Sequence, residues 1–173
     1  MPNEGRSPYL PIPMHVLHAY YESTDNSLKT LELSFDDPQD AREFFAAFNP
    51  GQFCLLSVIG KGESALGVAS AAWEGDFVRF TAQKLGSVTT ALHALKPGDP
   101  IGMRGPLGNG FPLAEWKSKN LVIIGGGCAF STLYALTKHL HHPSNRGDYG
   151  KLIVIYGTRT SGLCMYKQDI AAW

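Results

Sequence analysis

Apolar and polar residues alternate along the first two thirds of the chain, which is the pattern of strands with one buried and one exposed face. The alternation is clearest over residues 14–22 and 27–35, which are bridged by the turn residues Ser23-Thr24-Asp25-Asn26. Pro50-Gly51 then precedes a strongly apolar run over residues 52–59. Further strands are predicted over residues 66–72, 76–83 and 99–104. Six short antiparallel strands broken by Gly and Pro predict a closed barrel or a sandwich.

Two other segments of this first part have a different pattern. Residues 1–13 are rich in proline and polar groups and indicate an irregular lead-in. Residues 37–48 predict a short helix, with Asp36 or Asp37 as its cap and Pro38 at its first position.

The pattern changes near residue 118, and we expect a domain boundary there, between residues 1–117 and 118–173. Residues 121–124 and 152–156 are fully apolar runs, typical of buried parallel strands. The sequence between them predicts a helix over residues 129–141, ended by Pro143, and then a loop over residues 144–150. Residues 164–173 predict the start of another helix. The order strand, helix, strand is that of the βαβ unit used by dinucleotide-binding sheets.

This second part is too small to be a complete α/β domain. Two parallel strands and one and a half helices cannot bury both faces of a sheet. We expect that the polypeptide continues beyond residue 173; the alternative is that another protein completes the half-domain.

Two glycine-rich turns precede helices and indicate phosphate binding. Gly86-Ser87-Val88-Thr89 opens a helical pattern over residues 90–95, and Gly125-Gly126-Gly127 follows a predicted strand. Anions collect at helix N-termini because the first N–H groups lack partners and the helix dipole is positive there. GGGCAF lacks the full GxGxxG spacing, so a packing role for its glycines is the alternative. Two such turns suggest two nucleotides, as an electron-passing enzyme requires.

The residues beside the second glycine turn bear on which nucleotide it would hold. No acidic residue stands at the end of the second strand, where Thr158 and Arg159 lie instead. Arg159 could receive a 2′-phosphate, which would indicate NADP, or it could be a solvated side chain. Cys128 and Ala129 begin the helix. The favoured interpretation of Cys128 is a small residue in a tight turn; the alternative is a reactive thiol, because a thiol at a helix start tends to have a lowered pKa.

Composition excludes several classes of function. The 15 basic and 15 acidic residues cancel, which gives no pull toward nucleic acid or an anionic membrane. No apolar run reaches the roughly 20 residues of a membrane span, and the first residues lack a secretory apolar segment. The three cysteines are far apart in sequence, so we expect no disulfide framework, no metal site and a cytoplasmic protein. His139 and His142 are a conceivable metal pair, but a basic helix C-terminus is the favoured interpretation.

Longer strings resemble one known superfamily. GSVTTALHALKPGDPIGMRGPLGNGFPL, KNLVIIGGGCAFSTLYAL and VIYGTRTSGLCMYKQDI, with the PGQF segment over residues 50–53, resemble the ferredoxin–NADP reductase superfamily. The most similar branch contains hydrogenase gamma subunits and the electron-transfer subunits of anaerobic sulfite reductase and of dihydroorotate dehydrogenase. The resemblance implies an N-terminal six-stranded Greek-key barrel that holds FAD. It also implies a C-terminal NAD(P)-binding α/β domain, here incomplete.

The resemblance assigns residues to the flavin. Gly86, Ser87, Val88 and Thr89 match the loop that wraps the flavin pyrophosphate. Val68, Ala69 and Ser70 fall where the family has its flavin-binding Arg-x-Tyr-Ser, with Gly67 in place of the Arg and Ala69 in place of the ring-stacking Tyr. Ser70 is expected near the flavin N5. The dinucleotide site would comprise the residues of the second glycine turn and those after the second strand: Gly125, Gly126, Gly127, Cys128, Ala129, Thr158 and Arg159.

The implied function is electron transfer between NAD or NADP and a partner subunit such as a hydrogenase, a sulfite reductase or another iron–sulfur protein. The family's iron–sulfur cysteine cluster is not in this sequence, so the cluster is either in a further C-terminal part or absent. No side chain has a strong claim to acid–base catalysis, as expected where the cofactor performs the chemistry. The alternatives are a non-enzymatic flavin-binding docking subunit and a stand-alone flavin reductase.

Overall fold

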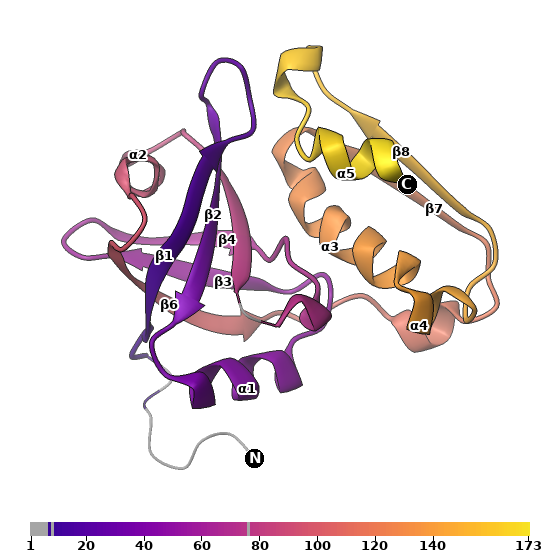
Figure 1. Ribbon diagram of the computed structural model, residues 1–173, viewed down its shortest axis with the longest axis horizontal. Helices are drawn as coiled ribbons and strands as arrows, with labels where there is room; N and C mark the ends of the chain where they lie inside the picture. Colours follow the sequence, from indigo (N-terminus) through magenta and orange to yellow (C-terminus); the bar gives the residue numbers. More distant parts are fainter. Residues whose placement is uncertain (1–6, 8, 76) are drawn as a thin grey trace.

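The computed structural model describes residue 7, residues 9–75 and residues 77–173. A six-stranded antiparallel sheet is followed along the chain by a two-stranded parallel sheet with helices (Figure 1). The predicted fold class is therefore confirmed. Part of the predicted lead-in, residues 1–6 and residue 8, and the predicted strand start at Asp76 lie outside the described residues.

The first sheet closes into a barrel. Its strands pair in the order β4-β3-β6-β1-β2-β5. Val68, directly after β4, bridges Phe80 of β5, and Ala69 N–H donates to the Arg79 carbonyl at 2.8 Å, so the two edge strands of the sheet meet. The strands are β1 Ile12–Tyr21, β2 Leu28–Phe35, β3 Phe53–Val58, β4 Gly62–Gly67, β5 Val78–Gln83 and β6 Pro100–Leu107.

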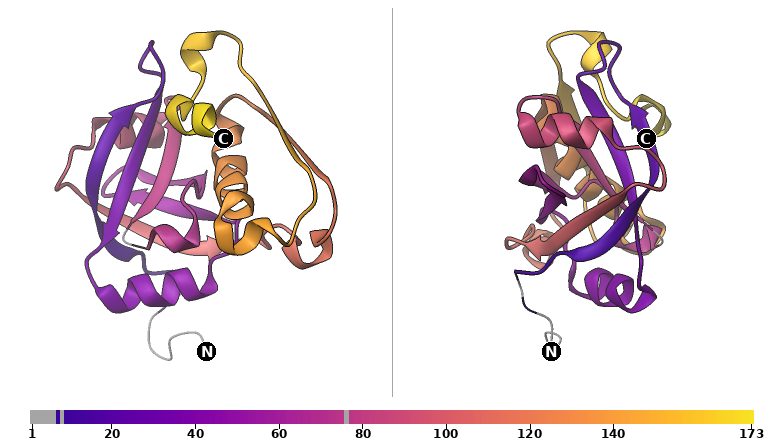
Figure 2. Two further views of the ribbon diagram at one scale, coloured as in Figure 1. Left: turned by 45° about the vertical axis from the view of Figure 1, so that its right-hand side comes forward. Right: turned by 90° about the vertical axis from the view of Figure 1, so that its left-hand side faces the viewer.

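The barrel core is built from the apolar positions of the alternating pattern. The fully buried members include Met14, Val16, Leu31, Leu33, Leu56, Phe80 and Met103. Helix α1, Pro38–Ala47, packs beneath the barrel (Figure 2), where Phe44 and Phe48 stack with ring centres 5.7 Å apart. Asp37 caps this helix by accepting a bond from Gln39 N–H at 2.8 Å, as one of the two predicted caps.

The strand predicted over residues 66–72 is displaced in the structure. Strand β4 spans Gly62–Gly67, and a 3-10 turn occupies Ala72–Glu74. β4 lies at the surface and alternates only weakly, so no clear apolar period marks it. Residues 68–71 are buried: Val68 lies in the barrel core and bridges Phe80, and Ala69 packs against the second part of the chain.

The second part is a βαβ unit, as predicted. Strands β7 and β8 pair in parallel, and α3 lies between them and the barrel (Figure 1). The predicted loop after Pro143 contains a helical turn, and the predicted last helix starts three residues late, after a 3-10 turn at Ser161–Leu163. The elements are β7 Leu121–Gly126, α3 Phe130–His141, α4 Pro143–Arg146, β8 Leu152–Gly157 and α5 Lys167–Ala172.

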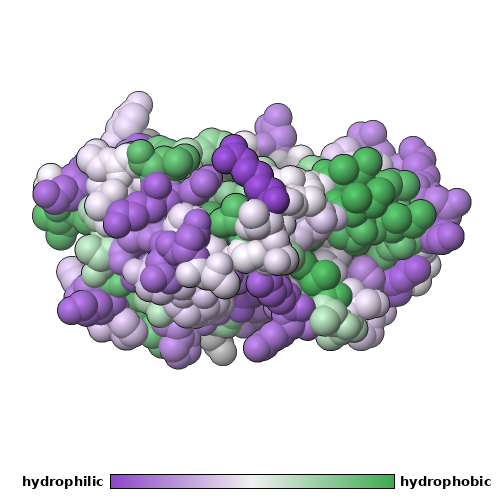
Figure 3. All heavy atoms as spheres, turned by 90° about the horizontal axis from the view of Figure 1, so that it is seen from above, coloured by the Kyte–Doolittle hydropathy of each residue, from purple (hydrophilic) through white to green (hydrophobic). Residues whose placement is uncertain are grey.

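The outer face of the β7–β8 sheet is apolar and exposed. Val122, Ile124, Ile153 and Ile155 alternate with inward residues and are 39–69% exposed. Figure 3 shows a large hydrophobic area at this end of the molecule. A parallel sheet normally has both faces covered. Within the described part of the chain, no helix has the length and apolarity needed to cross a membrane.

Candidate cofactor site

The first predicted phosphate site lies at the start of α2, Ser87–Ala94, directly after β5. Gly86 caps this helix in an extended conformation, and the space where its side chain would be is open. Thr89 Oγ1 accepts from the N–H groups of Leu85 (3.0 Å) and Gly86 (2.9 Å) and contacts the Gly86 carbonyl at 3.1 Å. The Thr89 hydroxyl, predicted as a phosphate donor, therefore shapes the loop, while exposed Ser87 and the helix start remain accessible.

The far end of α2 is fixed by a buried cation. Lys29 Nζ donates to the carbonyls of His93 and Leu95 at 2.8 and 2.7 Å. Ammonium groups at a helix C-terminus are favourable because the dipole is negative there. The His93 ring Nε2 lies 2.9 Å from the Ala82 carbonyl on β5, which ties the same helix end to the barrel. Helix α2 is thus held rigidly with its N-terminus toward solvent.

Two positions of the second glycine turn favour glycine for structural reasons. A side chain at Gly125 would overlap Leu133 and Phe130, each 2.7 Å from its Cβ position. Gly127 has φ +53°, a left-handed conformation that favours glycine. Gly127–Ala129 form a 3-10 turn, so α3 begins one residue later than predicted, at Phe130. Both the packing and the phosphate interpretation stay compatible with this geometry.

The structure brings four of the seven predicted dinucleotide residues together, whereas Gly125, Gly126 and Ala129 do not line the same pocket. Gly127, Cys128, Thr158 and Arg159 line one pocket of about 140 Å³. Leu28, Gln83 and Leu163 complete its walls. Thr158 Oγ1 donates to the Thr160 carbonyl at 2.9 Å, which holds the turn after β8.

A larger groove of about 340 Å³ lies between the residues that flank the two glycine turns. It runs from Thr89 and Leu85 at the α2 end to Cys128 and Ala129 at the α3 end. Sequence reasoning did not name its other walls, which become neighbours only through strand pairing and domain packing: Ser64, Ala65, Leu66, Gly67, Thr81, Gln83, Ser131 and Thr132.

Cys128 does not have the lowered pKa that is expected of a thiol at a helix start. Burial raises its pKa, and its Sγ faces the Thr81 carbonyl at 3.7 Å. The pKa is raised rather than lowered because burial destabilises the thiolate more than a short 3-10 turn stabilises it. The favoured interpretation, a small residue in a tight turn, fits the structure.

Val68, Ala69 and Ser70 are not accessible. They are 0%, 0% and 1% exposed, respectively. Ala69 packs in one cluster with Phe130 and Tyr134 of α3, and Ser70 Oγ accepts from Arg79 N–H at 3.0 Å. The start of α2 is therefore open to solvent, whereas residues 68–70 are closed to a flavin ring in this arrangement.

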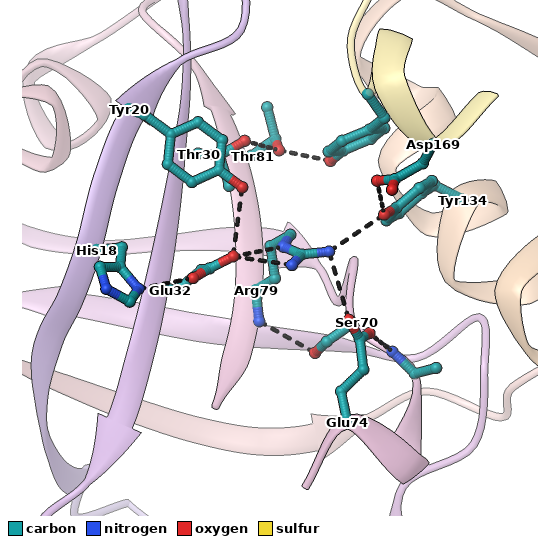
Figure 4. A network of polar contacts seen from close by, with 12 residues as sticks. His18, Tyr20, Thr30, Glu32, Ser70, Glu74, Arg79, Thr81, Tyr134 and Asp169 are labelled. Atoms are coloured by element: carbon teal, nitrogen blue, oxygen red, sulfur yellow. Dashed lines mark hydrogen bonds and ion pairs between the residues drawn. The ribbon is translucent and has the colours of Figure 1, made fainter. Parts of the chain in front are cut away.

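A polar network that the sequence did not reveal crosses from the barrel to α3 and α5 (Figure 4). Arg79 binds Glu32 through Nε at 3.0 Å and Nη2 at 2.8 Å, and its Nη1 donates to Tyr134 Oη at 3.2 Å. Glu74 lies 3.6 Å from Arg79 and also pairs with Lys138 of α3. Tyr134 in turn donates to Asp169 of α5. The network joins residues 35–64 positions apart, which no local pattern predicts.

Burial and charge act against each other in this network. Burial alone would raise the pKa of Glu32, but the bonds and charge of Arg79, with bonds from His18 and Tyr20, outweigh it and lower the pKa. Burial raises the pKa of Tyr134, and its bond to Asp169 adds to this. Glu32 therefore stays ionised and Tyr134 stays a neutral donor.

The described residues contain no group of three or more His, Cys, Asp or Glu placed to hold a metal ion. Of the conceivable metal pair, His139 lies beside Asn145, and His142 accepts from Ser144 N–H at 3.3 Å.

No protein-family model matches this chain. Sulfhydrogenase 1 subunit gamma of Pyrococcus furiosus is 36% identical over 172 residues, which is 99% of this chain and 56% of that protein. A probable dihydroorotate dehydrogenase B (NAD(+)) electron transfer subunit of the same organism is 34% identical over 126 residues, 73% of this chain and 44% of that protein. The chain spans about half the length of these relatives.

Solved structures agree on the fold. Ferredoxin-NADP+ reductase from Plasmodium falciparum superposes with a TM-score of 0.73 at 15% identity, over 94% of this chain and 64% of that chain. An NADH-dependent reduced ferredoxin-NADP oxidoreductase superposes with a TM-score of 0.73 at 23% identity, over 96% of this chain and 55% of that chain. The chain is therefore a homologue of the hydrogenase gamma and dihydroorotate dehydrogenase electron transfer subunits, built on the ferredoxin reductase-like fold.

Proposed function

We propose that this chain is the FAD-binding part of an electron-transfer subunit, which passes electrons between NAD(P)H and a redox centre of a partner protein. The observation that supports it best is the groove of about 340 Å³ that connects the open start of α2 with the glycine turn before α3. The names of the two relatives describe subunits, which favours a partner such as a hydrogenase, a sulfite reductase or another iron–sulfur protein.

The chain's own residues would position the cofactor rather than react. The first-turn N–H groups of α2 would bind the diphosphate of FAD, with Gly86 allowing close approach of the backbone. Thr89 would hold the loop in shape. Bound FAD would supply the chemistry of accepting a hydride and releasing single electrons. The pocket of Gly127, Cys128, Thr158 and Arg159 is the proposed place for part of NAD or NADP.

A second candidate function is a non-enzymatic docking subunit. It is favoured by the complete burial of Val68, Ala69 and Ser70, which closes the predicted ring position in this arrangement. The exposed apolar face of β7 and β8 would then be a surface for another protein or chain segment.

An absorption spectrum of the purified protein, repeated anaerobically after adding NADH and then NADPH, separates these functions. Flavin bands that bleach support the reductase and identify its donor, whereas bands that persist support the docking subunit. Electron transfer only to a protein acceptor, and not to small acceptors, would set it apart from a stand-alone flavin reductase. A colourless protein that takes up no added FAD would refute flavin binding.

One substitution tests the diphosphate position. Gly86→Val adds a side chain to open space on an extended backbone, so the fold should be unaffected while the ligand is blocked. Gly147→Val is the matched control, because Gly147 is also exposed with open space around its Cβ position. We expect loss of FAD in the first variant and retention in the second. Full FAD occupancy in Gly86→Val, alone or combined with Thr89→Ala, would contradict the assignment.

A further inference from the structure

One hydroxyl group at the α3 end of the candidate groove has no hydrogen bond. Thr132, in the first turn of α3, lines the groove and is partly exposed. Among the described residues, no hydrogen bond uses its Oγ1. A Cβ added to Gly67 would overlap this atom, so the hydroxyl lies where a side chain of residue 67 would be. Helix α3 thus presents, at the end of β4, a polar group that residue 67 lacks.

The other hydroxyl groups of the groove are bonded or buried. Thr81 Oγ1 lies 2.7 Å from Thr30 Oγ1 and 2.5 Å from Tyr166 Oη. Thr89 Oγ1 already holds the loop before α2. Ser131 is only 5% exposed. Apart from Ser64 of β4, Thr132 therefore carries the hydroxyl that a ligand in the groove can reach.

Strand β4 fixes which residues lie at which end of the groove. A Cβ at Gly62, the first residue of β4, would lie 3.6 Å from Val88 of α2, whereas one at Gly67, the last residue, would meet Thr132 of α3. Ser64 is therefore nearer the α2 end. If the diphosphate of FAD binds at the start of α2, its ring is left with the part of the groove beside Gly67 and Thr132.

The walls beside Thr132 suit a flat ring with a polar edge. Leu66 and Ala129 are apolar, and Gly67 has no side chain. Ligand pockets are typically apolar with a few polar groups that set the orientation of the ligand. The polar edge of a flavin ring accepts hydrogen bonds when oxidised and carries an added N–H when reduced. Because a hydroxyl both donates and accepts, one threonine can bind either form.

We propose that Thr132, and not Ser70, is the hydroxyl that binds the flavin ring, and that it fixes the orientation of the ring against β4. The inference rests on the proposed FAD function. Ser70 is 1% exposed, and its Oγ already accepts from Arg79 N–H. Thr132 lines the groove with α3 in its present place, and Gly67 leaves the room that the Thr132 hydroxyl occupies.

Two ligands and a pair of matched variants test this contact. FAD probes the whole groove, and ADP probes only its diphosphate end. Thr132→Val keeps the shape of the side chain and removes the hydroxyl, whereas Thr132→Ser keeps the hydroxyl. Thr137→Val is the control, because Thr137 lies on the same helix, does not line the groove and donates to the Leu133 carbonyl at 2.8 Å.

In titrations of flavin-free protein, we expect Thr132→Val to bind FAD about two- to tenfold more weakly, the effect of one lost hydrogen bond. Thr132→Ser and Thr137→Val should bind FAD like the unmodified protein, and ADP affinity should be equal in all four proteins. The visible absorption band of bound FAD should shift in Thr132→Val and stay in place in Thr137→Val.

A further variant moves the hydroxyl from α3 to β4. Gly67→Ser combined with Thr132→Ala places a hydroxyl at the position of the overlap from the barrel side. We expect this double variant to bind FAD more tightly than Thr132→Ala alone. Equal affinities of these two variants would show that the packing of α3, and not the hydroxyl, matters, and would overturn the inference.

The remaining outcomes separate the role of Thr132 from the proposed function. Equal FAD affinity and equal spectra of Thr132→Val and the unmodified protein would overturn the role of Thr132 and leave the cofactor site standing. Unmodified protein that binds FAD no more tightly than ADP would overturn it as well, because the ring then makes no contact. Binding of neither FAD nor ADP would refute the proposed function and this inference with it.

Discussion

Lys29 offers a sharp test of how the structure holds α2, because this residue is 7% exposed yet makes two short bonds to the end of that helix. Lys29→Met keeps most of the apolar stem and deletes both bonds to the carbonyls of His93 and Leu95. A bond from a charged donor contributes about 1.5–3 kcal/mol net, so two contribute at least about 3 kcal/mol. Burial also lowers the Lys29 pKa, which shows that the buried charge carries a cost that the methionine removes. We therefore expect a net loss of about 2 kcal/mol in the free energy of unfolding.

Urea unfolding followed by circular dichroism measures this loss, and thermal unfolding should show a Tm lower by about 4–8 °C. Lys117→Met is the control, because Lys117 pairs with Asp148 at 2.8 Å on the surface, with side chains 59% and 48% exposed. Water and salt screen such exposed pairs, so the control should change the stability little. Equal stability of the two variants would show that the bonds of Lys29 do not hold α2, and the reasoning would be wrong.

Packing, burial and charge lead to three more predictions. Gly67→Ala should lower the free energy of unfolding by about 1–3 kcal/mol because its Cβ overlaps Thr132, and adding Thr132→Ala should restore part of this loss. If urea unfolding showed that the two substitutions lower the stability additively, the overlap would be contradicted. Burial lowers the pKa of His93, so its neutral form stabilises the fold fully above pH ~6.5, and this stability is lost as the pH falls below that value. The free energy of unfolding of His93→Gln should therefore depend less on pH between about 7.5 and 5, and an unchanged dependence would refute this. Burial raises the pKa of Cys54 to about 12, so a thiol reagent at pH ~8 should label the half-buried Cys164 before Cys54. Equal labelling rates of the two cysteines in the native protein would be inconsistent with a buried Cys54.

Local patterns predicted the elements of this fold well. The alternation that predicted β1 and β2 works because the apolar positions of each strand face the core, although most of the polar residues of β2 are buried as well. Asp37-Pro38 marked the start of α1 because capping is a contact between sequence neighbours. β4 was misplaced because none of its residues is buried, so no apolar period marked it.

Local sequence patterns predicted only part of the candidate site. The glycine turns at residues 86 and 125–127 stood out because a strand, a turn and a helix follow one another in sequence. The burial of Ala69 and the pairing of Arg79 with Tyr134 depend on how α3 packs against the barrel. Nothing within a few residues of Arg79 distinguishes it from a surface arginine. The assignment of residues 68–70 to a ring site stays a prediction.

The packing of Ala69 also bears on how the protein unfolds. One hydrophobic cluster contains Leu28 and Ala69 of the barrel together with Phe130, Tyr134 and Met165 of the second part. Neither part can keep this cluster when the other unfolds, and two strands alone have little core of their own. The division after residue 117 would then mark a change of architecture within a single cooperative unit. Heating should melt both parts in one calorimetric transition, because the βαβ unit depends on the barrel for its stability.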